Sequence, residues 1–482
     1  MKLLAHTGSL LALCLLLCRC SSVVPADAQF ASFRCQSYFT DNVDGAGTYQ
    51  IGAILSLSTP GGQPDFDGNF DVQAMRLALK ELNDNRDIGG KRFSLRVCDT
   101  SADWSTGGGQ VTRDLTNWLI DHEKVSAIIS DASADTQTIA SITIHRNVLL
   151  LAISATSEEL TSLNDFVPLT VADPSKTVGL VWRIAPSDIY QGAVLAQLVS
   201  STVADDTSNI TVFAMQSPYG DGLVDALGKQ SVHGNSLLPR LKKHTFALDG
   251  TGLEAAVVAA KDDQSGAIII VGDEPLTAKI INAAMGFPGL AQAIPGHLLI
   301  ADGACDEALS KQTYNNGVTL AGAHCTRPGQ PESQAYKDFR ERFMAVFQRD
   351  PVQSSYTQHS YDAMYCLAMA HAWALGSKGL GSADGKGLAE GLRHLSTGTG
   401  YGFKPANVTA METALQKGMD INVDGTSGPL DFNPDTGEAP ADYEDWTLDA
   451  KGVLISRTFW AVQDLGNNQF SVLPAAASGT TP

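Results

Sequence analysis

The fold of this chain is decided by residues 127–161, which read AIISDASADTQTIASITIHRNVLLLAISATSEELT. Two apolar runs, 127–129 and 148–153, each end in a cluster of small polar residues, and a helical segment separates them. This order predicts strand, loop, helix, strand and loop, with both loops at the carboxyl ends of neighbouring parallel strands. Ligands bind at that edge of an open α/β sheet because helix N-termini and free amides point out of it. Simple N-capping by Ser, Thr and Asp is the alternative interpretation of both clusters.

Strand and helix patterns alternate along the rest of the chain. Residues 50–57 and 93–97 have strand patterns, and residues 70–83 carry apolar residues at helical spacing between them. A second alternating series begins after a crossing segment at 181–185. Such alternation requires parallel sheets covered by helices on both faces. We therefore expect an α/β protein of two lobes that face one ligand cleft.

The expected boundaries assign 48–183 and about 318–400 to the first lobe, and 184–317 and about 425–465 to the second. Residues 403–422 look like an insertion whose role the sequence does not reveal. The tail at 466–482 is expected to be disordered, since its end is small and polar.

The N-terminal segment has the pattern of an export signal. Residues 1–28 combine the basic Lys2, an apolar core at 10–17 and a small-x-small site at 26–28, and 29–47 form an N-terminal extension. Lipid attachment at Cys18 or Cys20 is the alternative to cleavage after Ala28. We expect an exported, periplasmic or extracytoplasmic monomer, because no later segment is apolar enough to span a bilayer.

Composition limits the partners that the protein can have. The chain has 482 residues, of which 44% are hydrophobic and 18% charged, and its net charge is −19. This length exceeds what one core usually serves, in agreement with two lobes. The negative charge argues against nucleic acids and anionic lipid headgroups as partners.

Five cysteines follow the signal segment, and export makes disulfides plausible. Their spacing matches no zinc pattern. Our preferred pairing is Cys35–Cys98 and Cys305–Cys325, although the sequence does not fix the connectivity. Cys366 is expected to stay free, since it lies in a helix between apolar neighbours.

Sequence motifs of enzymes are absent. The chain has no G-x-S-x-G elbow, phosphate loop or H-E-x-x-H motif. Asp420, Asn422 and Asp424 match only the first half of a calcium loop, and a polar turn is the preferred interpretation. We expect neither enzymatic activity nor a cofactor or metal.

Several further motifs occur in a recognisable order between about residues 49 and 460. They read YQIGAILSLSTPGG, SADTQ, ISATSEELT, VWRIAPSD, QSPYGDG, IIIVGDEPLTAKIINAAMG, IADG, SYDAMYCLAMAHAWA and GTSGPLDFN. In these motifs the chain resembles the type I periplasmic solute-binding proteins of the branched-chain amino acid (Leu/Ile/Val) branch, which are related to receptor ligand-binding domains. The resemblance implies two Rossmann-like lobes joined by three crossings, with a ligand held between them.

The resemblance also implies which residues contact an amino acid ligand. Ser133 and Thr156 would bind its carboxylate, and neutral donors of this kind form charge-assisted hydrogen bonds with such a group. The Ser154 carbonyl and the Asp302 carboxylate would receive the ammonium group, and Tyr219 would form an aromatic wall.

One position departs from the family's pattern. Where branched-chain amino acid binders have an aromatic residue after the IIIV strand, this chain has Asp273, with Glu274 beside it. Acids facing the cleft would favour a ligand with additional positive charge or hydrogen-bond donors. The alternative is that Glu274 points to water and Asp273 only caps its helix. The cysteines of this chain also do not match the positions of the family's usual cysteine pair.

The sequence thus predicts an exported solute-binding protein that captures a small amino-acid-like ligand. The resemblance implies an ABC transporter permease as its membrane partner. A sensor that presents the bound ligand to a membrane receptor is the alternative, and a hydrolase using Asp273 and Asp302 is a third hypothesis. The identity of the ligand stays open, since one side-chain change redirects specificity in such pockets.

Overall fold

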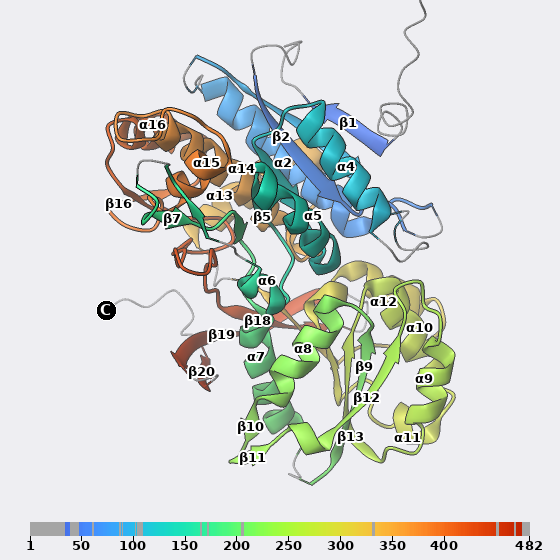
Figure 1. Cartoon of the computed structure of the whole chain (residues 1–482). Coiled ribbons are helices and arrows are strands. Elements are labelled where there is room, and N and C mark those ends of the chain that lie inside the picture. Colours follow the sequence, from blue (N-terminus) through green and yellow to red (C-terminus); the bar gives the residue numbers. More distant parts are fainter. Residues whose placement is uncertain are drawn as a thin grey trace, which may run out of the picture.

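The chain folds into two α/β lobes, one above the other in Figure 1. The computed structural model describes residues 34–38, 48–59, 62–85, 88, 90–101, 103, 109–163, 166–170, 173–203, 207–329, 333–449, 453–466 and 469–474. The export signal, Cys18, Cys20 and most of the N-terminal extension lie outside these residues.

The first lobe is built on a sheet in the order β1-β3-β2-β4-β5-β8, six strands among the described residues. All neighbours pair in parallel except β1, which runs antiparallel to β3. The strands are β1 (Cys35–Tyr38), β2 (Tyr49–Leu55), β3 (Phe93–Asp99), β4 (Ala127–Ser130), β5 (Leu149–Ala152) and β8 (Val181–Arg183).

Helices from two distant parts of the chain cover this sheet. The first group is α2 (Phe66–Asn85), α4 (Gln110–Asp121), α5 (Ser133–Arg146) and α6 (Glu159–Ser162). The second group is α13 (Gln334–Phe347), η3 (Pro351–Gln353), α14 (Thr357–Ala374), α15 (Gly385–Leu392), η4 (Pro405–Asn407) and α16 (Val408–Gln416). Two small ribbons complete the lobe: β6 (Val167–Pro168) with β7 (Thr177–Val178), and β16 (Thr399–Gly402) with β17 (Ile421–Asp424).

The second lobe has a sheet in the order β12-β9-β13-β14-β15-β18-β19-β20, eight strands among the described residues. The first five are parallel: β12 (Leu241–Phe246), β9 (Asn209–Met215), β13 (Ser265–Val271), β14 (Leu298–Ile300) and β15 (His324–Pro328). The last three add antiparallel: β18 (Tyr443–Leu448), β19 (Leu454–Gly466) and β20 (Gln469–Pro474).

Shorter elements surround this second sheet. The helices are α7 (Asp188–Thr202), α8 (Pro218–Gly228), η1 (Leu238–Arg240), α9 (Leu253–Ala260), α10 (Glu274–Ala284), α11 (Pro288–Ala291), η2 (Asp302–Ala304) and α12 (Glu307–Tyr314). A two-stranded ribbon pairs β10 (Ser231–Val232) with β11 (Asn235–Ser236).

Burial explains why the strand sequences are continuously apolar. The side chains of β4, β5 and β13 are almost all buried, because helices cover both faces of each parallel sheet. Every residue of α14 is buried too, since this helix packs against α2, α15 and α16. The expected fold class, two α/β lobes with parallel sheets, is thereby confirmed.

Two segments lie in a different lobe from the one expected, and the expected insertion, residues 403–422, packs into a lobe. Residues 318–328 contribute β15 to the second sheet, so the return to the first lobe comes later than residue 318. Residues 403–422 are part of the first lobe, where Phe403, Met411 and Leu415 are fully buried in its core. Residues 425–432 also pack on the first lobe, because Leu430 and Phe432 join the same core.

The expectation of a disordered tail from residue 466 is wrong for its first part. Strand β20 pairs antiparallel with β19, so its backbone groups are hydrogen-bonded rather than solvated. The ring of Phe470 also lies 5.5 Å from that of Tyr190 in α7. Residues 475–482 lie outside the described residues.

The predicted cysteine pairing is confirmed. Cys35–Cys98 joins β1 to β3, and Cys305–Cys325 joins the segment after β14 to β15. Cys366 is free and buried in α14, as expected. Within the described parts of the chain, we find no helix with the length and apolar character that crossing a membrane requires.

Candidate functional site

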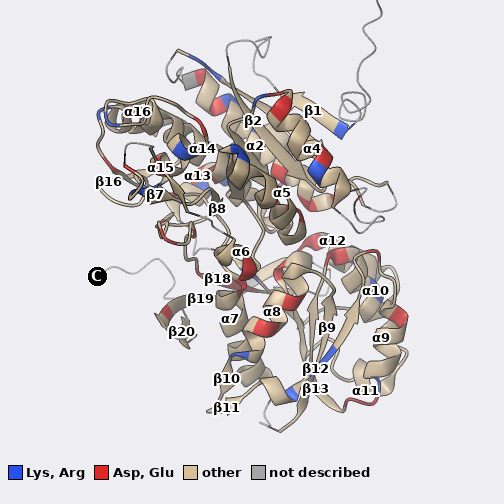
Figure 2. Ribbon diagram, viewed as in Figure 1, with Lys and Arg blue, Asp and Glu red and all other residues tan. Residues whose placement is uncertain are grey.

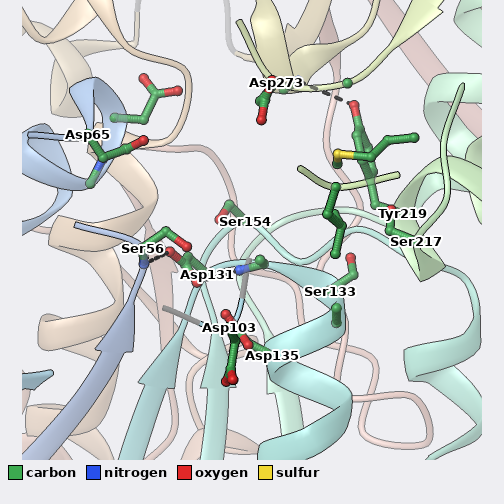
Figure 3. Close-up of a pocket in the computed structure, with 18 of the residues that line it drawn as sticks. Ser56, Asp65, Asp103, Asp131, Ser133, Asp135, Ser154, Ser217, Tyr219 and Asp273 are labelled. Atoms are coloured by element: carbon green, nitrogen blue, oxygen red, sulfur yellow. Dashed lines mark hydrogen bonds between the residues drawn. The ribbon is translucent and has the colours of Figure 1, made fainter. Parts of the chain in front are cut away.

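A cavity of about 430 Å³ lies between the two lobes, where the parallel strands of both sheets end (Figure 3). Its volume is within the range of small-molecule sites. The residues that line it are Ser56, Asp65, Asp67, Gly68, Asp71, Asp103, Gly109, Asp131, Ala132, Ser133, Ala134, Asp135, Thr138, Ser154, Met215, Ser217, Tyr219, Leu248, Gly272, Asp273, Asp302, Gly303 and Tyr356.

The start of α2 brings carboxylates to the first-lobe side. Asp65 caps this helix, since its carboxylate accepts a hydrogen bond of 2.7 Å from the Gly68 amide. Asp71, 4% exposed, accepts from the Ser360 hydroxyl of α14. The loop after β4 adds Asp131, whose two oxygens accept from the amides of Ser56 and Ala132.

The N-terminus of α5 carries Ser133 and Asp135. The Ser133 hydroxyl accepts a hydrogen bond of 3.3 Å from the Ser157 amide and so connects the loop after β4 to the loop after β5. Asp135 accepts from the hydroxyls of Thr100 and Thr112. Because Asp131 and Asp135 flank Ser133, this helix end already holds two carboxylates that use nearby donors.

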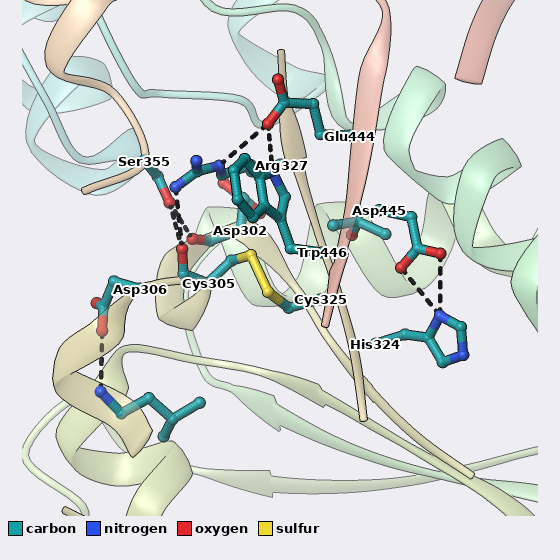
Figure 4. The surroundings of a disulfide bond; sticks show 12 residues. Asp302, Cys305, Asp306, His324, Cys325, Arg327, Ser355, Glu444, Asp445 and Trp446 are labelled. Atoms are coloured by element: carbon teal, nitrogen blue, oxygen red, sulfur yellow. Dashed lines mark hydrogen bonds and ion pairs between the residues drawn. A yellow bond between two sulfur atoms is a disulfide. The ribbon is translucent and has the colours of Figure 1, made fainter. Parts of the chain in front are cut away.

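The second lobe contributes Asp302, which follows β14. Its carboxylate is 3% exposed and accepts hydrogen bonds from the hydroxyls of Tyr219, at 2.6 Å, and Tyr356. The Cys305–Cys325 disulfide lies in the same region, as Figure 4 shows. The two tyrosines fix the orientation of Asp302 from two separate parts of the chain.

Asp273 and Glu274 follow β13. Asp273 caps α10, since its carboxylate accepts from the Leu276 amide at 2.9 Å, and it also lines the cavity. Glu274 is only 8% exposed. The alternative interpretation is therefore right about Asp273, which caps its helix, and wrong about Glu274, which does not point to water.

Burial and mutual repulsion raise the pKa values of these carboxyls. The pKa of Asp131 is raised to about 7 by burial and then by the charge of Asp135. The pKa of Asp65 is raised to about 7 by burial, with the charges of Asp67, Asp131 and Asp273 adding to it. Burial raises the pKa of Asp273 to about 6. The site thus contains carboxyls that exchange protons near neutral pH.

The structure brings most of the sequence-predicted site residues together. Ser133, Ser154, Tyr219, Asp273 and Asp302 all line the cavity. Thr156 does not line the cavity. It is fully buried, and its carbonyl oxygen accepts a hydrogen bond of 2.8 Å from the Asp188 amide.

Sequence reasoning missed the acids of the first lobe. Asp65, Asp67 and Asp71 come from the segment DFDGNFD, just after the first parallel strand. A signal was present, since Asp67 and Asp71 are four residues apart and share one face of a helix that begins at the ligand-binding edge. Tyr356, which precedes α14, carried no comparable signal.

Neither a metal centre nor a free catalytic pair emerges from this arrangement. Among the residues that the structure describes, no three His, Cys, Asp or Glu side chains are placed to hold a metal ion. Asp302 already accepts from two tyrosine hydroxyls and Asp273 from a helix amide. The geometry suits binding of a ligand through hydrogen bonds and charge.

Solved structures of several binding proteins have the same fold. A leucine-binding protein LivK from Thermotoga maritima is 19% identical, with a TM-score of 0.62 over 86% of this chain and 98% of its own. LivJ from Streptococcus pneumoniae, in complex with isoleucine, is 17% identical, with a TM-score of 0.61 over 89% of this chain and 100% of its own. A solute-binding protein of an ABC transporter from R. palustris, in complex with 4-hydroxybenzoate, is 14% identical, with a TM-score of 0.62 over 85% of this chain and 95% of its own.

No curated protein sequence matches the chain. The family model described as "Periplasmic binding protein" matches residues 48–443, which is most of the chain. The resemblance to type I periplasmic binding proteins of the LivK and LivJ type is therefore confirmed. The chain belongs to the periplasmic binding protein family.

Proposed function

We propose that this protein is exported, captures a small amino-acid-like solute between its lobes and delivers it to an ABC transporter permease. The observation that carries the proposal is the cavity between the lobes, at the carboxyl ends of both parallel sheets. Hinge closure around a ligand is a common movement of two-lobed binding proteins. Closure would bury the ligand and form the composite surface that a permease recognises.

The proposed contacts follow from the residues that line the cavity. Ser133 and Ser154 from the first lobe, with Tyr219, Asp273 and Asp302 from the second, would contact the ligand. Thr156 is not proposed to contact the ligand. Its carbonyl oxygen accepts from the Asp188 amide and so supports the backbone at Asp188. An ammonium group fits this set, because Asp302 and Asp273 supply acceptors from one side.

A thermal-shift screen of the purified protein tests the proposal. The panel contains amino acids, amides, polyamines and small peptides. A ligand at a hundred times its Kd stabilises the folded state by about 2.7 kcal/mol, so a true ligand raises Tm in a concentration-dependent way. The bound compound should be recovered unchanged after long incubation, whereas turnover would favour the hydrolase hypothesis.

A pair of matched variants shows where the ligand binds. Ser154→Trp should fill the cavity and abolish the shift, since Ser154 lines it. Ser141→Trp, on the exposed face of α5, should leave the shift intact. Equal responses of the two variants would contradict binding in this cavity.

A further inference from the structure

The charged residues in the described lining of the cavity all have one sign. Among the residues that the structure describes, eight aspartates and no lysine, arginine or histidine line it: Asp65, Asp67, Asp71, Asp103, Asp131, Asp135, Asp273 and Asp302. Acidic residues lie on both sides of the boundary between the lobes, as Figure 2 shows near α6 and α12. A ligand whose main anchor is a carboxylate would be repelled here, because no cation of the lining offsets these charges.

The carboxylates form two faces that oppose each other across the cavity. Asp65 and Asp67 come from the start of α2 in the first lobe, and Asp273 and Glu274 from the start of α10 in the second. The groups influence one another across the boundary: the charge of Asp273 helps to raise the pKa of Asp65, after burial and the charges of Asp67 and Asp131. The pKa of Glu274 is raised by burial, then by Asp306, Asp67 and Asp65.

Buried carboxylate oxygens without donors form a second, independent observation. Asp306 is 1% exposed, and one of its oxygens caps α12 by accepting from the Leu309 amide at 2.9 Å. Its other oxygen, Oδ2, has no hydrogen-bond partner among the described residues, and neither has Oδ1 of Asp67, which lines the cavity. Burial and the charge of Asp67 are the two largest causes that raise the pKa of Asp306, so the two acids are close neighbours. Leaving such oxygens unpaired costs free energy, and a ligand N–H group in the cavity would pair the Asp67 oxygen.

The distribution of these acids indicates an extended ligand. No three of the described acidic, His or Cys side chains are placed around one metal ion, so the charges are spread along the cavity. Met215, Leu248, Tyr219 and Tyr356 lie between them in the lining and offer apolar and aromatic surface. Methylene groups pack on such surface, and tyrosine rings also attract cations.

We propose that the cleft binds an organic cation with at least two positively charged nitrogen groups joined by a short methylene chain, and that this ligand draws the two acidic faces together as the lobes close. The inference rests on the proposed function, because it names the ligand class of the same cleft. Closure without such a cation would bring like charges together in a poorly hydrated space. The ligand therefore neutralises the faces as well as filling the cavity.

Isothermal titration of the purified, extensively dialysed protein tests this inference. The probes are 1,3-diaminopropane, 1,4-diaminobutane, 1,5-diaminopentane and spermidine, compared with lysine, leucine, isoleucine, glutamate and calcium chloride. We expect saturable binding of at least one diamine or spermidine, at least a hundredfold tighter than leucine. Binding should weaken by at least threefold between 20 and 500 mM NaCl, because salt screens charge attraction.

Charge-removing variants locate the contact on each face. Asp65→Asn and Asp273→Asn should each weaken binding of the cation by at least tenfold, and asparagine remains a good N-cap at both positions. Asp262→Asn is the matched control, since Asp262 is exposed before β13, at the opposite end of that strand from Asp273. The control should bind as the unchanged protein does.

The remaining outcomes separate this inference from the proposed function. Tight binding of leucine, isoleucine or glutamate without binding of any diamine would overturn the cation inference and leave the solute-binding role intact. Calcium binding alone, or diamine binding that ignores both variants, would also overturn it. If no probe binds, the inference fails, and mass spectrometry of solutes released from the denatured protein then decides the proposed function separately.

Discussion

The pKa values of single carboxyl groups at the cleft depend on burial and on neighbouring charges as well as on residue type. Asp65 has a pKa of about 7 because it is buried and faces Asp67, Asp131 and Asp273. Asp362 on α14 has a pKa of about 6 because of burial, although four hydrogen bonds oppose the shift. The same residue type thus has a pKa raised partly by neighbouring carboxylates in one place and anchors a segment through hydrogen bonds in another.

The first prediction concerns the pH dependence of the ligand-free protein. Asp65 keeps its proton up to about pH 7 in the folded state but loses it near pH 4 when unfolded. The folded state therefore binds more protons between these values, and its stability falls as pH rises through that window, by up to about 1.4 kcal/mol per pH unit for one such group. Asp65→Asn should reduce this slope, as measured by urea denaturation from pH 4 to 8.

Asp262→Asn serves as the control for that experiment, because Asp262 is exposed. Its replacement should leave the slope as it is. A slope that does not change in Asp65→Asn would mean that the Asp65 carboxyl is ionised in the folded protein well below pH 7.

At the scale of elements, helix α14 connects segments that are distant in sequence. Its Asp362 accepts hydrogen bonds from the amides and hydroxyls of Thr426 and Ser427, at 2.7–2.9 Å. Its Tyr361 and Tyr365 donate to Glu81 of α2. A segment that the sequence assigned to the second lobe is thereby attached to the first.

The second prediction is that Asp362→Ala strongly destabilises the protein. The change removes a fully buried acceptor and leaves the amides of Thr426 and Ser427 and the Ser427 hydroxyl without their acceptor. We expect the free energy of unfolding to fall by about 3–5 kcal/mol, as for other broken buried networks. Urea denaturation at pH 7 measures the change.

Asp362→Asn is the conservative comparison. Its amide oxygen still accepts hydrogen bonds, so we expect a smaller loss than for alanine. An alanine variant as stable as the unchanged protein would contradict the role of Asp362 as the anchor of this segment.

The whole molecule is two lobes whose facing surfaces carry like charges. Few direct ion pairs of the described residues bridge them; one joins Lys229 of the second lobe to Glu158 of the first, at 2.6 Å on the surface. Such exposed pairs contribute about 0–1 kcal/mol. The proposed balance between open and closed forms would therefore depend on the protonation of the cleft and on its ligand.

The third prediction follows from this balance. In the absence of ligand, the radius of gyration measured by small-angle X-ray scattering should increase between pH 5 and pH 8, because the facing carboxyls ionise in that range. A saturating ligand should remove this increase by holding the lobes closed. The double variant Asp65→Asn, Asp273→Asn should show a smaller increase than the unchanged protein.

The control for the scattering experiment is the same measurement on Asp262→Asn, which should follow the unchanged protein. A radius that stays constant with pH in the ligand-free protein would contradict the repulsion between the two faces.

Local sequence patterns were sufficient for the main features of the fold. Apolar runs such as 127–129 and 148–153 became adjacent parallel strands, because a run buried on both faces has no other low-energy place in an α/β lobe. The cysteine pairing was also predicted. The site was predicted in part, since the polar clusters after these strands do line the cavity.

The sequence by itself determined the alternation of strands and helices, the two lobes and the edge at which the cavity opens. Only the tertiary structure decided that residues 403–432 join the first lobe, that β20 extends the second sheet, and that acids from both lobes face each other. The physical reason is separation along the sequence. Periodicity and capping act within a few residues, whereas these outcomes depend on contacts between segments far apart in the chain. Asp65 and Asp273 illustrate this, since each is an ordinary helix cap locally and becomes part of one acidic cavity only when the lobes meet.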